Sequence, residues 1–382
     1  MKIPLAWRQL SYERIRLFVA LAGIGFADIL MFMQLGFQAA LYAGNLRLHN
    51  SFNGDIFLIS PQSDSLISMH SFSSRRIYQS LGVEGVKSVH PVYLDFALWK
   101  NPENQEPRAI LVMGFNPVDN ILALPNVQQN LDVIKFPDVV LFDQKSRDEF
   151  GNIAEDFNSG KTVVTEVADR KIRVGGLFSV GASFAADGNL ITSDINFIRL
   201  FPRRDSGLID LGVIKLESNA NLETVLSDLK QFLPEDILVF SKEEFIAHEK
   251  SYWQNRTAIG FIFSLGTAMG FIVGTVIVYQ ILYTDVADHL PEYATLKAMG
   301  YTETYLLSIV FQEAIILALL GYIPGFSITI FLYFNAARAT GLPIVMTLSR
   351  AIAVLILTIL MCCISGAIAM RKLQDADPAD IF

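Results

Sequence analysis

Four long apolar blocks constrain what this chain can fold into more than any other feature of its sequence. A helix rises about 1.5 Å per residue, so about 20 apolar residues are needed to cross roughly 30 Å of hydrocarbon. Hydrophobic residues make up 52% of the 382 residues, and they gather in these blocks instead of spreading along the chain. The pattern predicts four transmembrane helices, at residues 17–41, 257–283, 303–334 and 351–370.

The first block is too long for the apolar region of a cleaved signal peptide, and it lacks a clean small-x-small cleavage site. We therefore expect it to be retained as an anchor. Before it, apolar and basic residues alternate at helical spacing, which predicts an amphipathic helix at residues 1–16 on the inner membrane surface.

Basic residues at the two ends of the chain predict its orientation. Because Lys and Arg are enriched on the cytoplasmic side of membranes, we expect both termini to be cytoplasmic. Residues 284–302 and the tail at 371–382 would also be cytoplasmic, whereas residues 42–256 and a short loop at 335–350 would lie on the outer side. The basic residues concerned are Lys2, Arg8, Arg14, Arg16, Arg371 and Lys372.

The outer segment alternates strand-like runs with short helical ones, which is typical of a soluble α+β domain. We expect a membrane-proximal lobe formed by about residues 42–115 and 203–256, and a distal lobe at about 116–202. The predicted fold class is an α+β membrane protein, with four transmembrane helices and a large α+β domain between the first and second. Strands are predicted at 55–60, 86–99, 109–115, 139–142, 162–167, 171–178, 208–216 and 237–240, and helices at 222–232 and 242–256.

Charge and cysteine content exclude some functions. The net charge of −8 and the lack of a concentrated basic surface argue against a nucleic-acid partner. The two cysteines, Cys362 and Cys363, both lie in the fourth predicted span, so the outer domain must fold without disulfides.

Residues for catalysis or metal binding are not arranged in any known pattern. The five histidines lack metal-ligand spacing, and no nucleophile elbow is present. The run Ser159-Gly-Lys-Thr162 is similar to the end of a phosphate-binding loop, but Glu155 stands where that loop needs a glycine. We predict a non-catalytic chain with no metal site and no cofactor of its own.

Several span residues suggest close helix packing. Gly266, Gly270 and Gly274 recur at a four-residue spacing that lets another helix approach closely, either within one subunit or across a dimer. In the third span, Gly321 and Gly325 flank Pro324, which permits a bend.

Two acidic residues in the predicted spans are costly in hydrocarbon. Glu313 and Asp28 should therefore face other helices or water, and either a functional or a packing role fits Glu313. Asp28 would pair with a neighbouring polar group.

The inner loop at residues 284–302 is the most informative stretch. Pro291 can open a helix there and Gly300 can close it, which predicts a short cytoplasmic helix. Such a helix can insert into a groove on a soluble partner. The residues predicted to bind are Glu292, Tyr293, Leu296, Lys297, Met299 and Gly300.

This loop resembles the coupling helix of MacB-type and FtsX-type ABC exporter permeases, which commonly reads E-Y-A-x-L-K-A-M-G. Residues 292–300 match that pattern throughout. The resemblance extends to residues 5–10, to 312–314 with the two glycines of the third span, and to the ending at 377–379. Within this family the chain most resembles the DevC-type permeases of cyanobacteria.

The resemblance implies a homodimer in the bacterial plasma (inner) membrane, with a periplasmic outer domain. A separate ABC ATPase subunit, which would bind the ATP and Mg²⁺, is expected beneath the coupling helix. A periplasmic membrane-fusion adaptor and a TolC-like outer-membrane channel would complete the complex. The implied mechanism is mechanotransmission, in which ATP hydrolysis drives export of a lipid-like substrate such as a glycolipid.

Two other functions fit the same residues. An FtsX-like signalling scaffold would use the motion to activate a periplasmic hydrolase, and a lipoprotein-releasing permease would extract its substrate from the outer leaflet. In the exporter, Tyr293, Leu296 and Met299 would supply apolar contacts to the motor, while Glu292 and Lys297 would set orientation.

Overall fold

The computed structural model describes residue 12 and residues 14–374. The chain divides into two compact units, each treated separately below. The helical unit comprises Met1–Ala40, Ala258–Thr340 and Ile344–Phe382, and the sheet unit comprises Leu41–Thr257 with Gly341–Pro343. Most of the helix predicted at residues 1–16, and the chain end from residue 375, lie outside the described residues.

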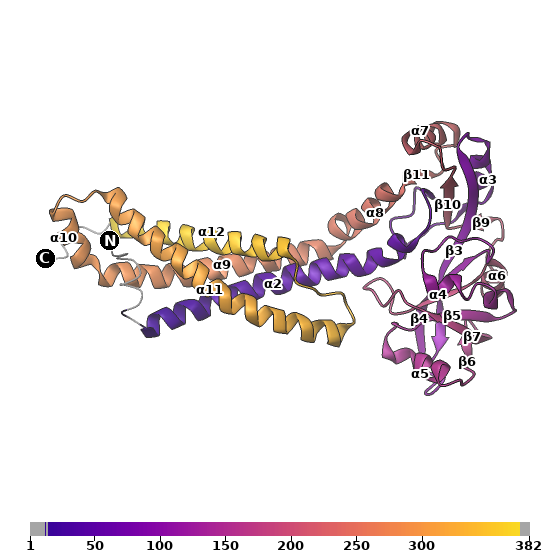
Figure 1. Ribbon diagram of the computed structural model, residues 1–382, viewed down its shortest axis with the longest axis horizontal. Helices are drawn as coiled ribbons and strands as arrows, with labels where there is room; N and C mark the ends of the chain where they lie inside the picture. The colour runs from indigo at the N-terminus through magenta and orange to yellow at the C-terminus, as the bar shows by residue number, and fades with distance from the viewer. Residues whose placement is uncertain (1–11, 13, 375–382) are drawn as a thin grey trace. The chain divides into compact units, whose positions relative to one another are not determined.

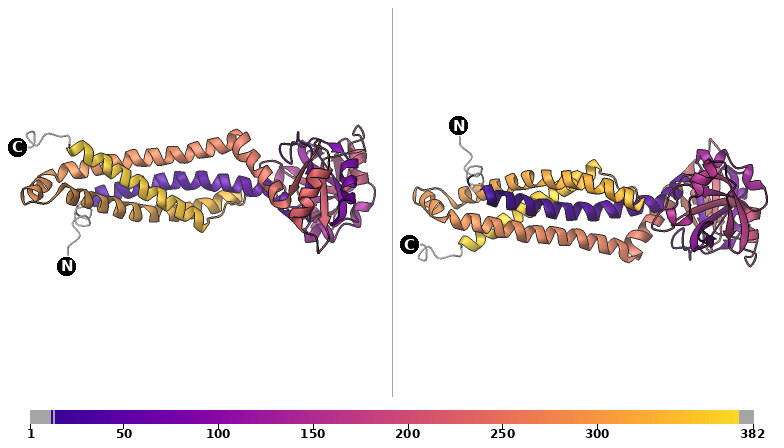
Figure 2. Two further views of the ribbon diagram at one scale, coloured as in Figure 1. Left: turned by 90° about the horizontal axis from the view of Figure 1, so that it is seen from above. Right: turned by 90° about the horizontal axis from the view of Figure 1, so that it is seen from below.

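The helical unit contains four helices that are long and apolar enough to cross a membrane. The four helices run alongside one another in every view (Figures 1 and 2). A shorter helix, α10, follows α9 at the end of the bundle where α2 begins and α12 ends. Their bounds are α2 (Arg14–Ser51), α9 (Ala258–Asp288), α10 (Leu290–Ala298), α11 (Glu303–Thr340) and α12 (Leu348–Gln374).

All four of these helices are longer than the predicted spans, and α2 and α11 extend furthest past them at one end. Helix α2 has 38 residues and continues ten residues past the predicted boundary at residue 41, so its last turns belong to the sheet unit. Helix α11 also has 38 residues and runs without interruption through Pro324 to Thr340. The loop predicted at 335–350 is therefore shortened to residues 341–347, because α11 continues through the helix-forming residues Ala336, Ala337 and Ala339 and α12 begins at Leu348.

The sheet unit is built on one nine-stranded sheet with the strand order β11-β1-β10-β3-β4-β8-β5-β7-β6, and a separate two-stranded sheet pairs β2 with β9. Most neighbours are antiparallel, but β8 is parallel to β4, and β7 is parallel to β5. The strands are β1 (Ile56–Ile59), β2 (Phe72–Ser73), β3 (Val86–Lys100), β4 (Pro107–Phe115), β5 (Val139–Asp143), β6 (Val164–Val167), β7 (Arg170–Phe178), β8 (Asn189–Ser193), β9 (Leu208–Ile209), β10 (Leu211–Leu216) and β11 (Leu238–Ser241).

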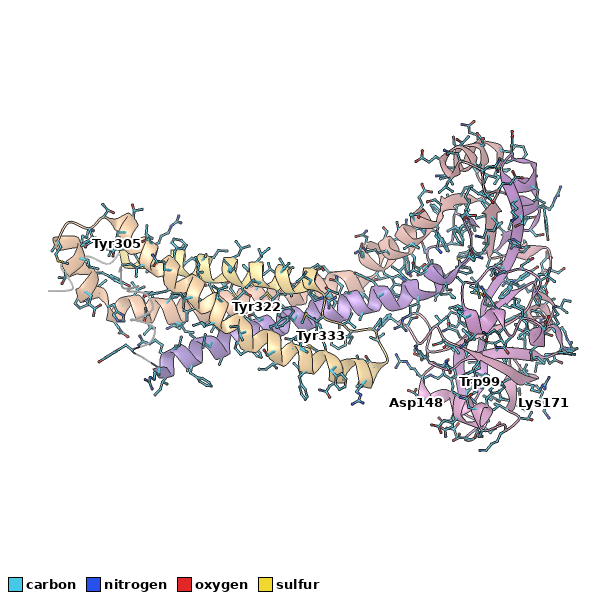
Figure 3. All side chains as sticks on the ribbon, in the orientation of Figure 1. Trp99, Asp148, Lys171, Tyr305, Tyr322 and Tyr333 are labelled. Atoms are coloured by element: carbon cyan, nitrogen blue, oxygen red, sulfur yellow. The ribbon has the colours of Figure 1, made fainter. Side chains whose placement is uncertain are left out.

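Strand β3 organises this sheet. It has 15 residues; its first half pairs with β10 and its second half with β4. Near the end of β3, Trp99 also pairs with Val167 of β6. The strands β3, β4, β8, β5, β7 and β6, in that spatial order, therefore form a closed ring around a buried apolar cluster. Trp99 is fully buried there and its Nε1 donates to the Phe150 carbonyl oxygen at 3.1 Å (Figure 3).

The predicted lobes are therefore divided differently in the structure. Residues 107–115 were assigned to the membrane-proximal lobe, but β4 pairs with β8 of the predicted distal lobe. The division falls within β3, because this one strand is long enough to belong to both groups of strands. A second apolar cluster also combines residues from both predicted lobes, among them Phe57, Phe115 and Ile191.

Short helices cover this sheet. Some of the helices and strands differ from the prediction. Strand β8 and helix α6 were not predicted, and the run at 208–216 forms two strands in different sheets. The helix predicted at 242–256 is α8 followed by a π-helical segment. The helices are α3 (Arg75–Gln79), η1 (Ser80–Gly82), α4 (Pro125–Gln128), η2 (Val133–Lys135), η3 (Asp148–Phe150), α5 (Ile153–Asn158), α6 (Asp194–Leu200), α7 (Leu222–Phe232), α8 (Lys242–Ser251) and η4 (Tyr252–Arg256).

Candidate functional site

Helix α10 is formed by the residues that the sequence analysis singled out. Pro291 lies in its first turn, where a missing backbone N–H leaves no hydrogen bond unmade. Gly300 follows the helix at a φ of +93°, a conformation that glycine adopts without steric cost. The Tyr301 N–H donates to the Leu296 carbonyl oxygen at 3.1 Å and closes the last turn. Thus α10 is a short, well-delimited helix between α9 and α11.

The predicted binding residues of α10 differ in how deeply they are buried. Tyr293 is only 5% exposed and packs in an apolar cluster with residues of α9, α11 and α12, and Leu296 is half-buried against the same cluster. These two side chains attach α10 to its own chain, so the expectation that both present apolar contacts to a partner is not supported. The exposed members of the predicted set are Glu292, Lys297, Met299 and Gly300.

Charged residues tie the end of α9, just before α10, to α2. Arg16 of α2 lies 2.5 Å from Asp288 and 3.6 Å from Asp285, measured from Nη2 to Oδ2 and from Nη1 to Oδ1. His289 caps the end of α9, since its Nδ1 lies 2.9 Å from the Asp285 carbonyl oxygen. The first and second spans are thereby joined next to the candidate coupling helix.

The glycines of α9 pack against α2 of the same chain. A Cβ atom added at Gly274 would lie 2.7 Å from Ala27, and one at Gly270 would lie 3.1 Å from Met31. A Cβ at Gly266 would meet the Gln34 side chain. Of the two packing modes left open by the sequence, the one within a single subunit therefore accounts for this glycine face.

The glycines of α11 approach the other side of α2. A Cβ added at Gly321 would lie 2.6 Å from Ile24, and one at Gly325 would lie 3.0 Å from the Gly25 carbonyl oxygen. Further along α11, the hydroxyl of Tyr333 donates to the Phe32 carbonyl oxygen of α2 (Figure 3). Helix α2 is thus packed closely against both α9 and α11.

Asp28 of α2 is fully buried beside this crossing. The Thr358 hydroxyl of α12 donates to its Oδ1 at 2.6 Å, which supplies the polar partner expected for this residue. Cys362 belongs to the apolar cluster of the same unit.

The sheet unit contains a buried polar pair that the sequence analysis did not identify. His49, in the last turn of α2, and Glu249 of α8 are both fully buried, and their Nε2 and Oε2 atoms lie 3.3 Å apart. The Glu249 carboxylate also accepts from the Leu66 N–H at 2.8 Å and from Trp253 Nε1 at 2.7 Å. No local pattern could have revealed this pair, since 200 residues separate its members.

These donors change the acidity of Glu249. Burial alone would raise its pKa, but the hydrogen bond and charge of His49, together with the Trp253 and Leu66 donors, outweigh burial and hold the pKa below its ordinary value. The carboxylate is therefore stabilised in its ionised form where α2 meets α8.

The sheet unit has a groove of about 710 Å³. Its charged residues balance one another, so the groove offers no net charge to a ligand. Arg170 and Arg199 both pair with Asp138, and Arg204 pairs with the buried Asp210. The remaining charged residues at the groove, Arg203, Asp95 and Asp169, leave cations and carboxylates balanced. The groove is lined by Asp95, Ala168, Asp169, Arg170, Arg199, Leu200, Phe201, Pro202, Arg203 and Arg204.

The segment similar to a phosphate-binding loop is a polar turn after α5. Gly160 has a φ of +82°, and Lys161 Nζ is bound to Asp156 Oδ1 at 2.5 Å. Within the described part of the chain, no group of three or more His, Cys, Asp or Glu side chains is placed to hold a metal ion.

Comparison with known proteins matches the part of the chain that contains α10. Residues 260–378 match the family model described as the FtsX-like permease C-terminal domain. This match confirms the FtsX-like permease domain expected from the resemblance, whereas the DevC-type assignment stays a prediction. No curated protein matches the chain.

Among the solved structures, two similar ones are an extracellular domain and a periplasmic region. One is the extracellular domain of the noncanonic ABC-type transporter YknZ from Gram-positive bacteria, with 16% identity over 50% of this chain and 100% of that chain, and a TM-score of 0.33. The other is the periplasmic region of MacB from Actinobacillus actinomycetemcomitans, with 14% identity over 56% of this chain and 97% of that chain, and a TM-score of 0.34.

Proposed function

Because residues 260–378 form an FtsX-like permease domain, we propose that this chain is the transmembrane permease subunit of an ABC exporter, itself non-catalytic. A separate ATPase subunit binds ATP and Mg²⁺ and docks on α10. The chain lies in the bacterial plasma membrane as a homodimer, with its termini and α10 in the cytoplasm and the sheet unit in the periplasm.

The combination of buried and exposed side chains on α10 is the observation that carries this proposal. Tyr293 attaches the helix to three of the spans, while Glu292, Lys297 and Met299 are exposed on it. A partner bound to the exposed side would therefore move a helix that is packed firmly into its own bundle. This is what coupling between a soluble motor and a membrane unit requires.

The packing of the helical unit supports mechanotransmission. The spaces between α2 and its neighbours are closed by glycine contacts and by a buried apolar cluster that includes Ala20, Ile24 and Leu317. Closely packed helices move as rigid elements instead of enclosing a wide conduit. ATP-driven motion at α10 would then be carried along the spans, and the substrate would be propelled outside the membrane.

We propose the substrate and the outer partners from the resemblance to DevC-type permeases. The cargo is a lipid-like molecule, a glycolipid in the first instance. It leaves through a periplasmic membrane-fusion adaptor and a TolC-like outer-membrane channel. The sheet unit is the part of the chain that would contact the adaptor.

Purification of the tagged chain from native membranes tests this function. The retained proteins and lipids are identified by mass spectrometry, and ATP hydrolysis is measured on the same sample. We expect an ABC ATPase with an adaptor and an enriched glycolipid. Loss of every ATPase, under conditions that preserve other membrane complexes, would contradict the proposal.

A second candidate is a signalling scaffold in which the same motion activates a periplasmic hydrolase. The family match to FtsX-like permeases favours it, and the packed interior of the helical unit fits it equally well. Retention of a hydrolase in place of an adaptor in the same purification would support this candidate. A lipoprotein-releasing permease would instead retain lipoprotein.

A further inference from the structure

Strand β11 is the open edge of the nine-stranded sheet. It stands at one end of the strand order, and among the described strands it pairs with β1 alone. The strand at the other end, β6, bonds to β7 and also to β3, so that end is closed. Figure 1 shows β11 at the margin of the sheet, next to α7 and α8. An open edge presents backbone groups that a further strand can bind.

The cap of α8 decides which backbone groups of β11 face outward. The Ser241 N–H donates to Glu244 Oε2 at 2.8 Å, so it does not donate to Ile56, the residue opposite it on β1. Successive residues of a strand turn their backbone groups to opposite sides, so Val239 also turns its N–H and C=O away from β1. Within the described residues, no other segment bonds to the backbone of Val239. Its outward N–H and C=O are therefore available to a partner strand.

A mainly apolar groove of about 330 Å³ lies beside this edge. Side chains of an added strand alternate between its two faces, so every second one can enter such a groove while the backbone pairs with β11. The apolar residues that line the groove come from the strand and from the turn before it; they are Leu233, Pro234, Ile237, Leu238, Val239 and Phe240.

Charged residues around the edge favour a basic partner. The two lysines nearby are already bound, since Lys230 lies 3.2 Å from Glu244 and Lys242 donates to carbonyl oxygens of the sheet unit. Glu235, just before β11, and Glu243, just after it, are exposed and have no ion pair within the described part of the chain. An uncompensated carboxylate thus flanks the strand at each end.

These flanking carboxylates argue against a second copy of the chain as the occupant. Antiparallel pairing of two β11 strands would bring Glu235 of one copy toward Glu243 of the other at both ends of the contact. Like charges facing each other across paired strands are destabilising. An extended segment with an apolar centre and Lys or Arg at its ends meets no such repulsion.

We propose that β11 is a docking edge, to which an extended segment of a periplasmic partner protein adds as a further strand. Its apolar side chains enter the groove, and its Lys or Arg side chains meet Glu235 and Glu243. This inference rests on the proposed function in one respect, since that function places the sheet unit in the periplasm beside an adaptor. The capacity of β11 to bind a strand is a property of this chain alone and can be measured without the adaptor.

Peptide binding to the full chain tests the docking edge. The probe is a fluorescent peptide of about eight residues, which alternates valine and threonine between terminal lysines. Fluorescence anisotropy measures its binding to the chain in phosphatidylcholine nanodiscs, which carry no net charge, with empty nanodiscs as the blank. We expect saturable binding that N-methylation of alternate peptide nitrogens weakens at least about tenfold, because it removes backbone donors. Terminal glutamates in place of the lysines should also weaken it.

Two substitutions at one position separate backbone pairing from packing. Val239→Pro removes the outward N–H, and we expect it to weaken peptide binding at least about tenfold. Val239→Ala removes side-chain contacts but keeps the N–H, so it should bind the peptide like wild type. Glu235→Gln should weaken binding of the lysine peptide about two- to fivefold and leave that of the glutamate peptide no weaker.

Photocrosslinking identifies the occupant in native membranes. A benzophenone amino acid at Leu238 should crosslink to the adaptor, within a segment that has an apolar centre and basic ends. A crosslink to another copy of this chain would overturn the proposal, as would equal binding of the N-methylated peptide or wild-type binding by Val239→Pro. If the peptide binds β11 but no ABC ATPase copurifies with the chain, the proposed function fails and the docking edge stands.

Discussion

His49 Nε2 lies 3.3 Å from Glu249 Oε2, and both side chains are fully buried in the sheet unit. The first residue belongs to the last turn of α2 and the second to α8, the helix that leads through the π-helical segment toward α9. The two segments that connect the sheet unit to the first and second spans are thus tied together within that unit.

Removal of one member of this pair should destabilise the sheet unit. His49→Ala leaves a buried carboxylate with fewer partners, and we expect a loss of about 3 kcal/mol. Hydrogen exchange of the full-length chain in detergent should show faster exchange at Leu66 and along α8. His90→Ala, which removes a less buried histidine 2.9 Å from Asp119, is the control and should leave this region unchanged.

The stability of the sheet unit should fall with acid because of Glu249. Its pKa in the folded state is lowered from 4.5, so the folded state favours the ionised carboxylate. The stabilisation is fully present above about pH 4.5 and is lost as the pH falls through the lower, folded-state pKa. Urea unfolding followed by tryptophan fluorescence at several pH values measures it. Glu249→Gln should show less loss with acid than wild type; an equal loss would contradict this role.

Buried and exposed residues of α10 should respond differently to substitution. Met299 is 64% exposed, so Met299→Asp should weaken ATPase binding by about 1–2 kcal/mol without affecting folding. Tyr293→Ala should instead destabilise the fold around α10 by about 3 kcal/mol, because it leaves a cavity. Copurification yield and thermal unfolding of the detergent-solubilised chain separate the two effects. A Met299→Asp chain that retains the ATPase in full would show that the partner binds elsewhere.

The crossing of α2 and α11 offers a matched pair of glycine substitutions. An added Cβ at Gly325 would lie 2.9 Å from Asp28 Cβ and 3.0 Å from a backbone oxygen, so Gly325→Ala should cost about 2 kcal/mol. At Gly25 the nearest atom would lie at 3.5 Å, an ordinary contact, and Gly25→Ala should stay close to wild type. Thermal stability in detergent checks both; equal stability of the two variants would mean that the helices can separate there.

Local patterns in the sequence predicted much of this architecture. Mean hydropathy over about 20 residues located the four long helices, because crossing hydrocarbon demands length and apolarity from each helix by itself. Pro291 and Gly300 predicted both ends of α10 for a similar reason, since each acts on the backbone at its own position. Most strands of the sheet unit were also predicted from alternation of apolar and polar residues.

The elements that were missed depend on contacts beyond the local sequence. Strand β8 is buried along its whole length, so it shows no alternation that would distinguish it. Strand β3 was predicted, but not its pairing with β10, β4 and β6, which decides how the domain is divided. Strand order depends on which distant segments bury their faces together.

The sequence by itself determined that this chain has four long apolar helices, a large α+β domain and a short helix delimited by Pro291 and Gly300, because each follows from forces that act within one segment. Only the tertiary structure decided that Tyr293 faces its own bundle and that Gly274 packs against α2. It also decided that His49 meets Glu249 and that Asp28 meets Thr358. These pairings join residues from different segments, and their energy exists only once the helices and strands have packed together.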